Sequence, residues 1–246
     1  LVNNGENVAV TQHKLLENRL VPAAEGPAFV EEKPYEVVFT GENFRYVFSK
    51  QFGTFTSMVV NGEEQLAEPV RLTVWRAPTD NDKNIKVFWG SYNIWQGENF
   101  DKLFSKVYDC TVTEGCICVD ASLAGVSRKP IFRYTLQMKE NCRGVISVSL
   151  NGTVREKVVY LPRLGFEFTL PKKNMKFRYY GCGPMESYSD LRHGSTVGMY
   201  ESTAEAEYVP YVRPQEHGNH VGVRSLTIDG IEFTANEKSF EANVSA

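Results

Sequence analysis

The chain has 246 residues, of which 42% are hydrophobic and 23% are charged, the proportions of an ordinary folded protein rather than of a disordered chain. Its 27 basic and 30 acidic residues give a net charge of −3. No basic run exceeds the two residues of Lys172-Lys173, so the sequence does not show the clustered cationic face of a nucleic-acid binder. No apolar run approaches the roughly 20 residues that span a membrane. These totals predict a globular protein of one large or two small domains.

The N-terminus and the cysteines indicate the context of the chain. The first residues, LVNNGENVAVTQHKLL, contain no Met, no basic start and no apolar signal core, so we expect them to be the cut end of a longer chain. The five cysteines are an odd number, and Cys116 and Cys118 share one face of a predicted strand. Free thiols are therefore favoured over a disulfide framework or a zinc site, which predicts a reducing, cytoplasmic location.

The first half of the chain alternates apolar and polar residues with the two-residue period of half-buried strands. A stretch rich in Pro, Ala and Gly, residues 20–34, is predicted to be a linker. Asn61-Gly62 is predicted to form a tight hairpin turn, because both residues tolerate a positive φ. The pattern lapses between about Asn84 and Phe104, where we expect a loop with one short helix. The strands predicted in this half cover residues 35–40, 44–49, 54–60 and 70–75.

The second half continues the same pattern, with Asn151-Gly152 as another candidate turn. Many short strands, frequent turn signals and almost no helical period predict an all-β antiparallel sandwich. The strands predicted here cover residues 107–113, 117–123, 131–139, 145–154, 166–170, 176–180, 197–200, 220–228 and 231–234.

The sequence RAPTDND, residues 76–82, is the first of three chemically dense stretches. The oxygens of Asp80, Asn81 and Asp82 could chelate a cation or bind sugar hydroxyls. Proline followed by Asp and Asn also forms turns whose side chains cap their own backbone, and we favour this structural interpretation. Arg76 joins the three residues as a candidate for contact with a sugar.

The second stretch, YYGCGPMESYSD, spans residues 179–190. On a helix, Glu186 and Asp190 would share a face, and each charge would raise the pKa of the other carboxyl group. A glycosidase needs its two carboxyl groups about 5 to 10 Å apart, on opposite sides of a sugar ring, and residues this close in sequence rarely straddle a ring. We therefore predict that the pair organises a loop and assign no catalytic residue. Tyr180 and Tyr188 are further candidates for sugar binding.

The third stretch, YVPYVRPQEHGNHVGVR, spans residues 208–224. Its E-H-x-x-H order differs from the H-E-x-x-H helix of zinc proteases, so we predict no metal site. A buried polar network that fixes the loops is favoured instead. Four charged or imidazole side chains remain candidates for sugar contact: Arg213, Glu216, His217 and Arg224.

In this order and at this spacing, the three stretches resemble the C-terminal small-chain domain, the fifth domain, of bacterial β-galactosidases of glycoside hydrolase family 2. The resemblance covers roughly residues 34–246. Residues 1–33 resemble the tail of a preceding immunoglobulin-like domain plus a linker, with Val8 to Gln12 as its last strand. The implied fold is a large antiparallel supersandwich similar to galactose mutarotase, incomplete at its C-terminal end.

The resemblance also implies a division of labour. In that family the two catalytic glutamates and a magnesium site lie in a central (β/α)₈ barrel, and this sequence has no alternation of strands with helices of about 10–15 residues. We therefore expect no cofactor in this chain, magnesium in the parent enzyme, and the barrel and other parent domains as partners. An incomplete sandwich would expose a sheet edge, which predicts a homo-oligomer; no nucleic-acid or membrane partner is expected.

Three functions remain open from the sequence. The first is a supporting domain, inactive alone, of an enzyme that hydrolyses terminal β-D-galactosides with retention through a covalent intermediate. The second is a carbohydrate-binding module with a concave face. The third is a mutarotase-like epimerase, with His217 or His220 as acid and Glu186 as base. The side chains proposed for the concave face are Arg76, Asp80, Tyr180, Glu186, His217 and Arg224.

Overall fold

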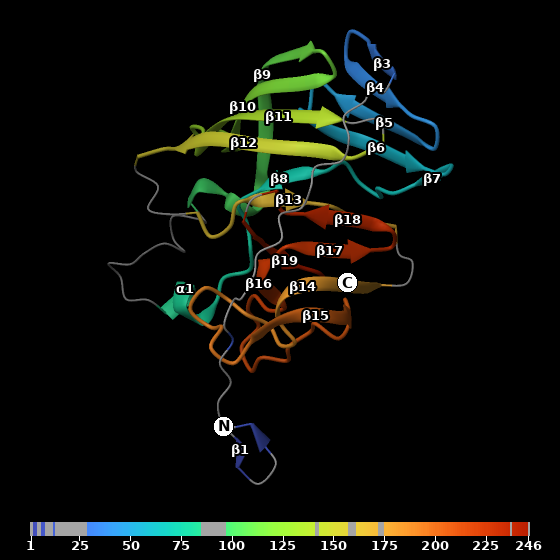
Figure 1. Ribbon diagram of the computed structural model, residues 1–246. Coiled ribbons are helices and arrows are strands. Elements are labelled where there is room, and N and C mark those ends of the chain that lie inside the picture. The colour runs from blue at the N-terminus through green and yellow to red at the C-terminus, as the bar shows by residue number, and fades with distance from the viewer. Residues whose placement is uncertain are drawn as a thin grey trace. The chain divides into compact units, whose positions relative to one another are not determined.

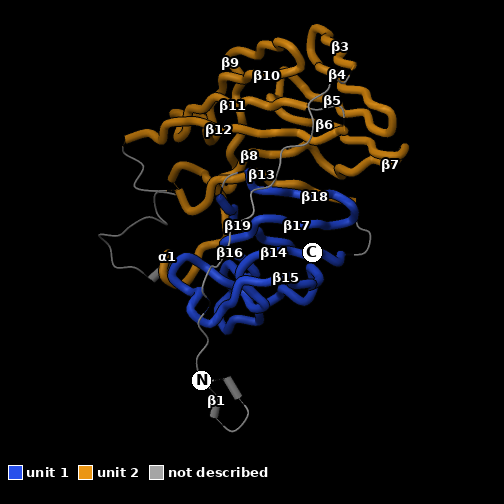
Figure 2. The backbone as a smooth tube through the Cα atoms, viewed as in Figure 1, with its two compact units in different colours: residues 1–22, 172–246 blue, residues 23–171 orange. Residues whose placement is uncertain are grey.

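The computed structural model describes residues 2–3, 6–7, 12, 29–84, 97–140, 143–156, 161–171, 175–236 and 238–245. It is all-β and its paired strands are antiparallel, as the alternating pattern predicts (Figure 1). The chain divides into two compact units: unit 1 comprises residues 1–22 and 172–246, and unit 2 comprises residues 23–171 (Figure 2). The predicted immunoglobulin-like tail over residues 1–33 lies mostly outside the described residues and stays a prediction.

Unit 2 begins with a five-stranded meander in which each strand pairs with the next. The alternation FRYVFS in β5 buries Phe44, Tyr46 and Phe48 on one face. Asn61 and Gly62 have φ values of 51° and 81°, which confirms the predicted turn. The strands are β3 (Phe29–Glu32), β4 (Glu36–Thr40), β5 (Phe44–Ser49), β6 (Thr54–Val60) and β7 (Glu63–Glu64).

The linker predicted over residues 20–34 is wrong for its last part. Residues 29–32 form β3, which pairs with β4 in register from Phe29 opposite Thr40 to Glu32 opposite Val37. Val30 packs against the core of unit 2. The proline-rich composition did not predict this strand. It forms because pairing with β4, which follows within ten residues, and burial outweigh local propensity.

A four-stranded sheet in the order β12-β11-β10-β9 supplies the rest of this core. Side chains from both sheets form one hydrophobic cluster, in which Phe39 and Phe48 of the meander pack with Ile117 and Leu136. Two sheets thus bury one face each against a shared core. The strands are β9 (Leu103–Thr113), β10 (Cys116–Gly125), β11 (Phe132–Glu140) and β12 (Ile146–Val154); β8 (Arg71–Thr73) pairs separately with β13 (Gly165–Glu167).

The described residues include two short helices, α1 (Asp80–Asn84) and η1 (Phe100–Lys102). Most of the loop predicted from Asn84 to Phe104 lies outside the described residues; η1 falls within the predicted range, and α1 falls on RAPTDND, where no helix was predicted. Within the described ranges, no helix has the length and apolar character needed to cross a bilayer. The four described cysteines carry free thiols, as predicted.

Unit 1 contains a four-stranded sheet in the order β15-β14-β17-β18 and the pair β16-β19. Phe177, Tyr179, Val223 and Leu226 form its buried core. The single strand predicted at 220–228 is two strands, because the chain leaves β16 at Val223 and Arg224 N donates to Tyr180 O instead. The strands are β14 (Lys176–Gly183), β15 (Thr196–Thr203), β16 (Asn219–Val223), β17 (Ser225–Ile228), β18 (Ile231–Thr234) and β19 (Phe240–Asn243), with β1 (Val2–Asn3) and β2 (Glu6–Asn7) near the N-terminus.

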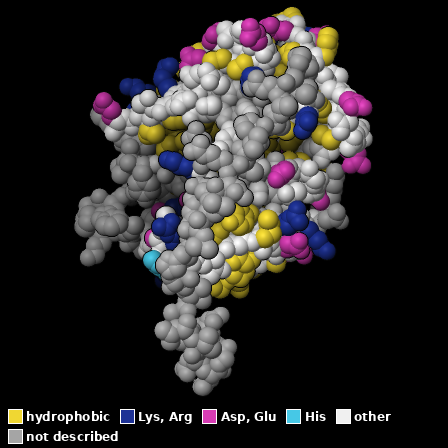
Figure 3. Space-filling model, viewed as in Figure 1, with side chains coloured by type: hydrophobic (Ala, Val, Ile, Leu, Met, Phe, Trp, Pro, Cys, Tyr) yellow, Lys and Arg dark blue, Asp and Glu magenta, His cyan; other side chains and the backbone are white. Residues whose placement is uncertain are grey.

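Part of the outer face of β14 and β15 is apolar and exposed. Tyr180 lies opposite Met199, and Cys182 lies opposite Val197; the exposed fractions of Tyr180, Met199 and Val197 are 36%, 58% and 45%. Figure 3 shows hydrophobic side chains gathered where Figure 1 places these strands. β15 is the edge of its sheet, and the side-chain amide of Gln12 binds both Val197 N (2.5 Å) and Val197 O (2.9 Å).

The second turn predicted from the sequence, Asn151-Gly152, is wrong. Both residues lie inside β12, where Gly152 pairs with Tyr134. A Cβ on Gly152 would lie 2.4 Å from Cζ of Phe132 and 2.5 Å from Arg133 O. Gly152 is thus present because the Phe132 ring occupies the space of a side chain, not because the backbone turns.

We expect Gly152→Ala to lower the free energy of unfolding by about 1–3 kcal/mol, because the methyl group must displace a buried ring or the strand itself. The matched control is Gly165→Ala in β13, where a Cβ has no atom within 4 Å and the change should stay within about 0.5 kcal/mol. Urea denaturation of both variants measures this; equal stabilities would contradict the assignment.

Candidate functional site

The RAPTDND stretch builds a helix cap. Thr79 precedes α1, and its Oγ1 accepts a hydrogen bond from Asp82 N (3.3 Å). In return Oδ2 of Asp82 accepts from Thr79 N (2.7 Å) and Thr79 Oγ1 (2.8 Å). This reciprocal pair is a capping box, which satisfies backbone N–H groups that the first helical turn leaves without partners. The structure confirms that side chains of this stretch cap their own backbone.

Arg76 completes the same cluster. Its Nη1 lies 2.6 Å from Asp82 Oδ2, and its Nε donates to Pro162 O (3.2 Å), which fixes the cap to the segment before β13. Burial alone would raise the pKa of Asp82, but the hydrogen bonds from Arg76 and Thr79 outweigh it and hold the pKa below its usual value. Of the other two candidates, Asp80 is half-buried in the first turn and Asn81 is exposed.

The second stretch places Glu186 at the junction of several loops. Its Oε2 accepts from Gly218 N (2.8 Å) and lies 3.5 Å from the Tyr188 hydroxyl, while its Oε1 accepts from the Tyr211 hydroxyl. One carboxylate therefore joins the loop after β14 to the loop before β16. This confirms, for Glu186, the predicted role of organising a loop.

Glu186 and Asp190 do not form a helical pair. A backbone bridge between Tyr188 and Leu191 turns the chain sharply between them, with both N–H groups bonded at 3.0 Å. Asp190 is exposed at this turn. The two carboxylates thus do not share a helix face, and the expected coupling between them has no geometric basis.

The tyrosines around Glu186 act as donors. The hydrogen bond to the Glu186 carboxylate raises the pKa of Tyr211 to about 12. Burial and the charge of Glu186 also raise the pKa of Tyr188. Both phenols therefore keep their protons at neutral pH and remain available to donate to the carboxylate.

The most buried polar side chain of the third stretch is His220, which is 1% exposed. Its Nε2 lies 2.9 Å from Oε2 of Glu207, and its Nδ1 lies 3.0 Å from the Tyr179 hydroxyl and 3.3 Å from Cys182 O. The Tyr179 and His220 rings also stack, with centroids 4.3 Å apart. A buried imidazole is thus satisfied on both nitrogens by β14 and by the segment after β15.

Ser187 and Asn219 extend this network. Ser187 N donates to Asn219 O (2.6 Å), Asn219 Nδ2 donates to Ser187 O (3.0 Å), and Ser187 Oγ accepts from Val221 N (3.0 Å). Ser187 is 0% and Asn219 is 3% exposed. Asn243 of β19 donates to His217 O at 2.6 Å. The predicted buried polar network that fixes the loops is confirmed.

A protein-family model described as "Beta galactosidase small chain" matches residues 40–246. The chain belongs to the β-galactosidase small-chain family. It is 30% identical over 220 residues to the β-galactosidase of Actinobacillus pleuropneumoniae and 34% identical over 219 residues to that of Lactobacillus delbrueckii subsp. bulgaricus, covering 88% and 86% of this chain. In both cases it spans 21% of the relative's length. The resemblance seen in the three stretches is therefore confirmed.

The structure of the small chain places the candidate sugar-contact residues in separate clusters. Arg76, Asp80, Asn81 and Asp82 belong to unit 2, and the other candidates belong to unit 1. Within unit 1, Glu186 and Tyr188 come together. Glu216 and His217 contact residues that were not candidates: Oε1 of Glu216 lies 3.5 Å from Asn243 Nδ2, and Nδ1 of His217 lies 3.2 Å from Glu207 O. Four candidates lie elsewhere on unit 1: exposed Asp190 and Arg213, partly exposed Tyr180, and half-buried Arg224.

Glu207 is the important residue that the sequence did not reveal. It lies in TAEAEY, residues 203–208, which has the composition of a solvated turn, yet its side chain is only 8% exposed. The burial of alternate residues along β14 could have indicated Tyr179, the other partner of His220. No local pattern could have indicated Glu207, because its contact with His220 depends on how two loops meet.

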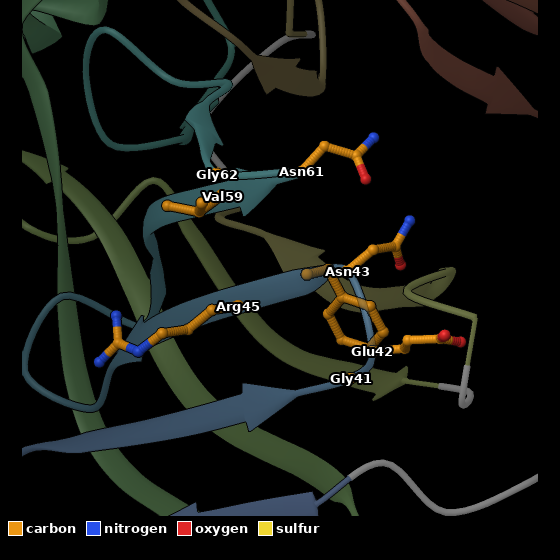
Figure 4. A pocket seen from close by; sticks show the side chains of 8 residues that line it. Gly41, Glu42, Asn43, Arg45, Val59, Asn61 and Gly62 are labelled. Atoms are coloured by element: carbon orange, nitrogen blue, oxygen red, sulfur yellow. The ribbon is translucent and has the colours of Figure 1, made fainter.

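The small-chain structure shows no metal centre in its described part: no group of three or more His, Cys, Asp or Glu side chains is arranged to hold an ion. A shallow hollow of about 480 Å³ lies beside the Asn61-Gly62 turn, where Asn61 N donates to Asn43 O at 2.7 Å. Figure 4 shows the side chains of Asn43 and Asn61 projecting the same way from this turn. None of the candidate site residues lines this hollow.

Asp82→Asn should lower the free energy of unfolding by about 2–4 kcal/mol, because it leaves the Arg76 guanidinium without its buried partner and weakens the cap. Asp190→Asn is the matched control, since Asp190 is exposed and the change there should stay within about 0.5 kcal/mol. Chemical denaturation at neutral pH compares the two; an equally small effect of both variants would refute the buried pair.

The lowered pKa of Glu207 predicts how the free energy of unfolding depends on pH. Burial alone would raise its pKa, but the hydrogen bonds from His220 and Ser202 and the charges of His220 and His217 lower it below the ordinary 4.5. A lowered folded-state pKa stabilises the fold fully above the unfolded-state pKa, and this contribution is lost as the pH falls through the folded value. Glu207→Gln should therefore cost about 1–3 kcal/mol at pH 7.

The difference between wild type and Glu207→Gln should shrink as the pH falls below about 4.5. Thermal unfolding followed between pH 3 and pH 7 measures it. Glu232→Gln, an exposed residue of β18, is the control. A difference that grows on acidification would contradict this role of the buried Glu207 carboxylate.

Proposed function

We propose that this chain is the non-catalytic, active-site-supporting small-chain part of a β-galactosidase that hydrolyses terminal non-reducing β-D-galactosides with retention. The family match over residues 40–246 supports the enzyme class. The observation that carries the supporting role is the state of three carboxylates that lie in or directly beside the three stretches, called the motif carboxylates below. Asp82, Glu186 and Glu207 each accept hydrogen bonds from within the chain.

A retaining glycosidase needs a free carboxylate to attack the sugar and a second carboxyl group, with a raised pKa, to protonate the leaving oxygen. The pKa values of Asp82 and Glu207 are lowered instead. Among the described residues burial raises the pKa of Glu140, but this side chain lies in β11 and accepts from Gly144 N at 3.1 Å. The motif carboxylates are therefore suited to holding loops and not to acid catalysis.

The catalytic glutamates and a magnesium ion would then be supplied by the rest of the enzyme, in the cytoplasm. The relatives are about four times as long as this chain, whose matched part spans 21% of each. Other domains of the same polypeptide are the partners that this proposal requires. The loops held by Glu186 and by the Arg76–Asp82 pair are the parts of the chain that we assign to supporting the sugar site.

The test is hydrolysis of nitrophenyl β-D-galactoside by the purified 246-residue chain at high concentration with magnesium present, after circular dichroism has shown β structure. We expect no turnover above buffer. Turnover that Glu186→Gln abolishes and Glu232→Gln leaves intact would overturn the proposal. Calorimetry with galactose and lactose on the same sample should show no saturable binding; millimolar or tighter binding would favour a carbohydrate-binding module.

A further inference from the structure

An open cleft of about 1090 Å³ lies in unit 2, away from the three motifs. Three separate segments line it: residues 97–98, the connection between β10 and β11 with the start of β11, and the end of β12 with the residues after it. Its charged side chains are Arg128, Lys129, Arg133 and Arg155 against Glu98 and Glu156. A chain with a net charge of −3 thus gathers four cations around one cleft.

Two of the arginines are held in place by backbone carbonyls. Arg128 Nε donates to Gly97 O (2.8 Å), and Arg155 Nη1 donates to Lys129 O (3.1 Å). Arg155 Nη2 also pairs with Glu98 Oε1. Glu98 therefore neutralises Arg155, while the terminal amino groups of Arg128 keep their donors for another acceptor.

Lys129 and Arg133 are exposed, and neither forms an ion pair with any residue that the structure describes. Arg133 lies over the Tyr108 ring, 5.0 Å from its centroid, which orients the guanidinium without using its N–H groups. Together with Arg128 they present N–H donors from the β10–β11 connection and from the start of β11. Such a set suits the oxygens of a phosphate-like group, for which arginine provides paired donors.

Glu98 supplies a complementary acceptor. A Cβ on Gly125 would lie 2.5 Å from Glu98 O, so only glycine allows this segment to pack against the end of β10. The second oxygen of Glu98, Oε2, is buried and accepts no hydrogen bond within the described part of the chain. A buried carboxylate oxygen that accepts no hydrogen bond favours a ligand group that can donate one, such as a hydroxyl.

We propose that this cleft binds a small polyhydroxylated molecule that carries a tetrahedral oxyanion, the chemical class of a sugar phosphate. Arg128, Lys129 and Arg133 hold the oxyanion, and a hydroxyl of the same ligand donates to Glu98 Oε2. The inference rests on the charges and geometry of unit 2 and is independent of the proposed function. The three free cations surround one cleft rather than following a stripe, which favours a compact ligand over a nucleic acid.

Calorimetry on the full chain tests this with galactose 6-phosphate, inorganic phosphate and galactose, each at the same ionic strength. Galactose 6-phosphate should bind saturably and at least roughly tenfold more tightly than inorganic phosphate, and galactose should not bind, because the oxyanion supplies the charge-assisted bonds. Added sodium chloride should weaken binding. No saturable binding, or equal affinity for phosphate and sugar phosphate, would overturn the proposal.

The double variant Lys129→Ala with Arg133→Gln should weaken galactose 6-phosphate binding at least roughly tenfold, since it removes two of three free cations. Both side chains are exposed, so the melting temperature should stay close to that of wild type. Arg45→Gln, which removes one charge at another exposed arginine of unit 2, is the surface-charge control and should bind like wild type. Unchanged binding by the double variant, or an equal loss in Arg45→Gln, would refute the site.

Discussion

The hydrogen-bond chain from Tyr179 through His220 to Glu207 is the interaction on which the loops of unit 1 depend. An imidazole that is 1% exposed must find partners for both nitrogens inside the protein. It finds them on two segments that are far from β16 in sequence: Tyr179 is 41 and Glu207 is 13 residues away. An unsatisfied buried polar group is costly, so the loop after β15 is held in the position in which the Glu207 carboxylate reaches His220.

The same physical logic operates at the other two motifs. Asp82 serves at once as the cap of α1 and as the partner of Arg76, and Glu186 serves a backbone amide and two phenols. Each carboxylate is shared by several donors from different segments. Side chains that the sequence suggests as catalytic or binding residues are thus the points at which irregular loops are joined to regular sheets.

At the cationic cleft, in contrast, the candidate binding residues could not be recognised from the sequence. Basic runs in the sequence have at most two members, and one of the two such pairs, Arg128-Lys129, lines the cleft. The cations come from the β10–β11 connection and from the end of β12, which strand pairing places side by side because Phe132 lies opposite Val154. A charge pattern that is dispersed along the chain becomes local only through the register of the sheet.

The sequence by itself determined the strands that bury alternate residues, and it determined them closely. β5 and β6 have the predicted bounds, and Asn61-Gly62 turns the chain as expected, because alternation and positive φ are local properties. The sequence also indicated that His220 and Asn219 belong to a buried network and that RAPTDND caps its own backbone.

Only the tertiary structure decided the rest. The same Asn-Gly pair lies within a strand at residues 151–152, because the Phe132 ring fills the space above Gly152. Residues 29–32 are a strand because β4 pairs with them. Glu207 becomes a buried partner only when two loops meet. Alternation reports how one strand faces its core, whereas partners across loops and sheets depend on contacts between segments that no local pattern encodes.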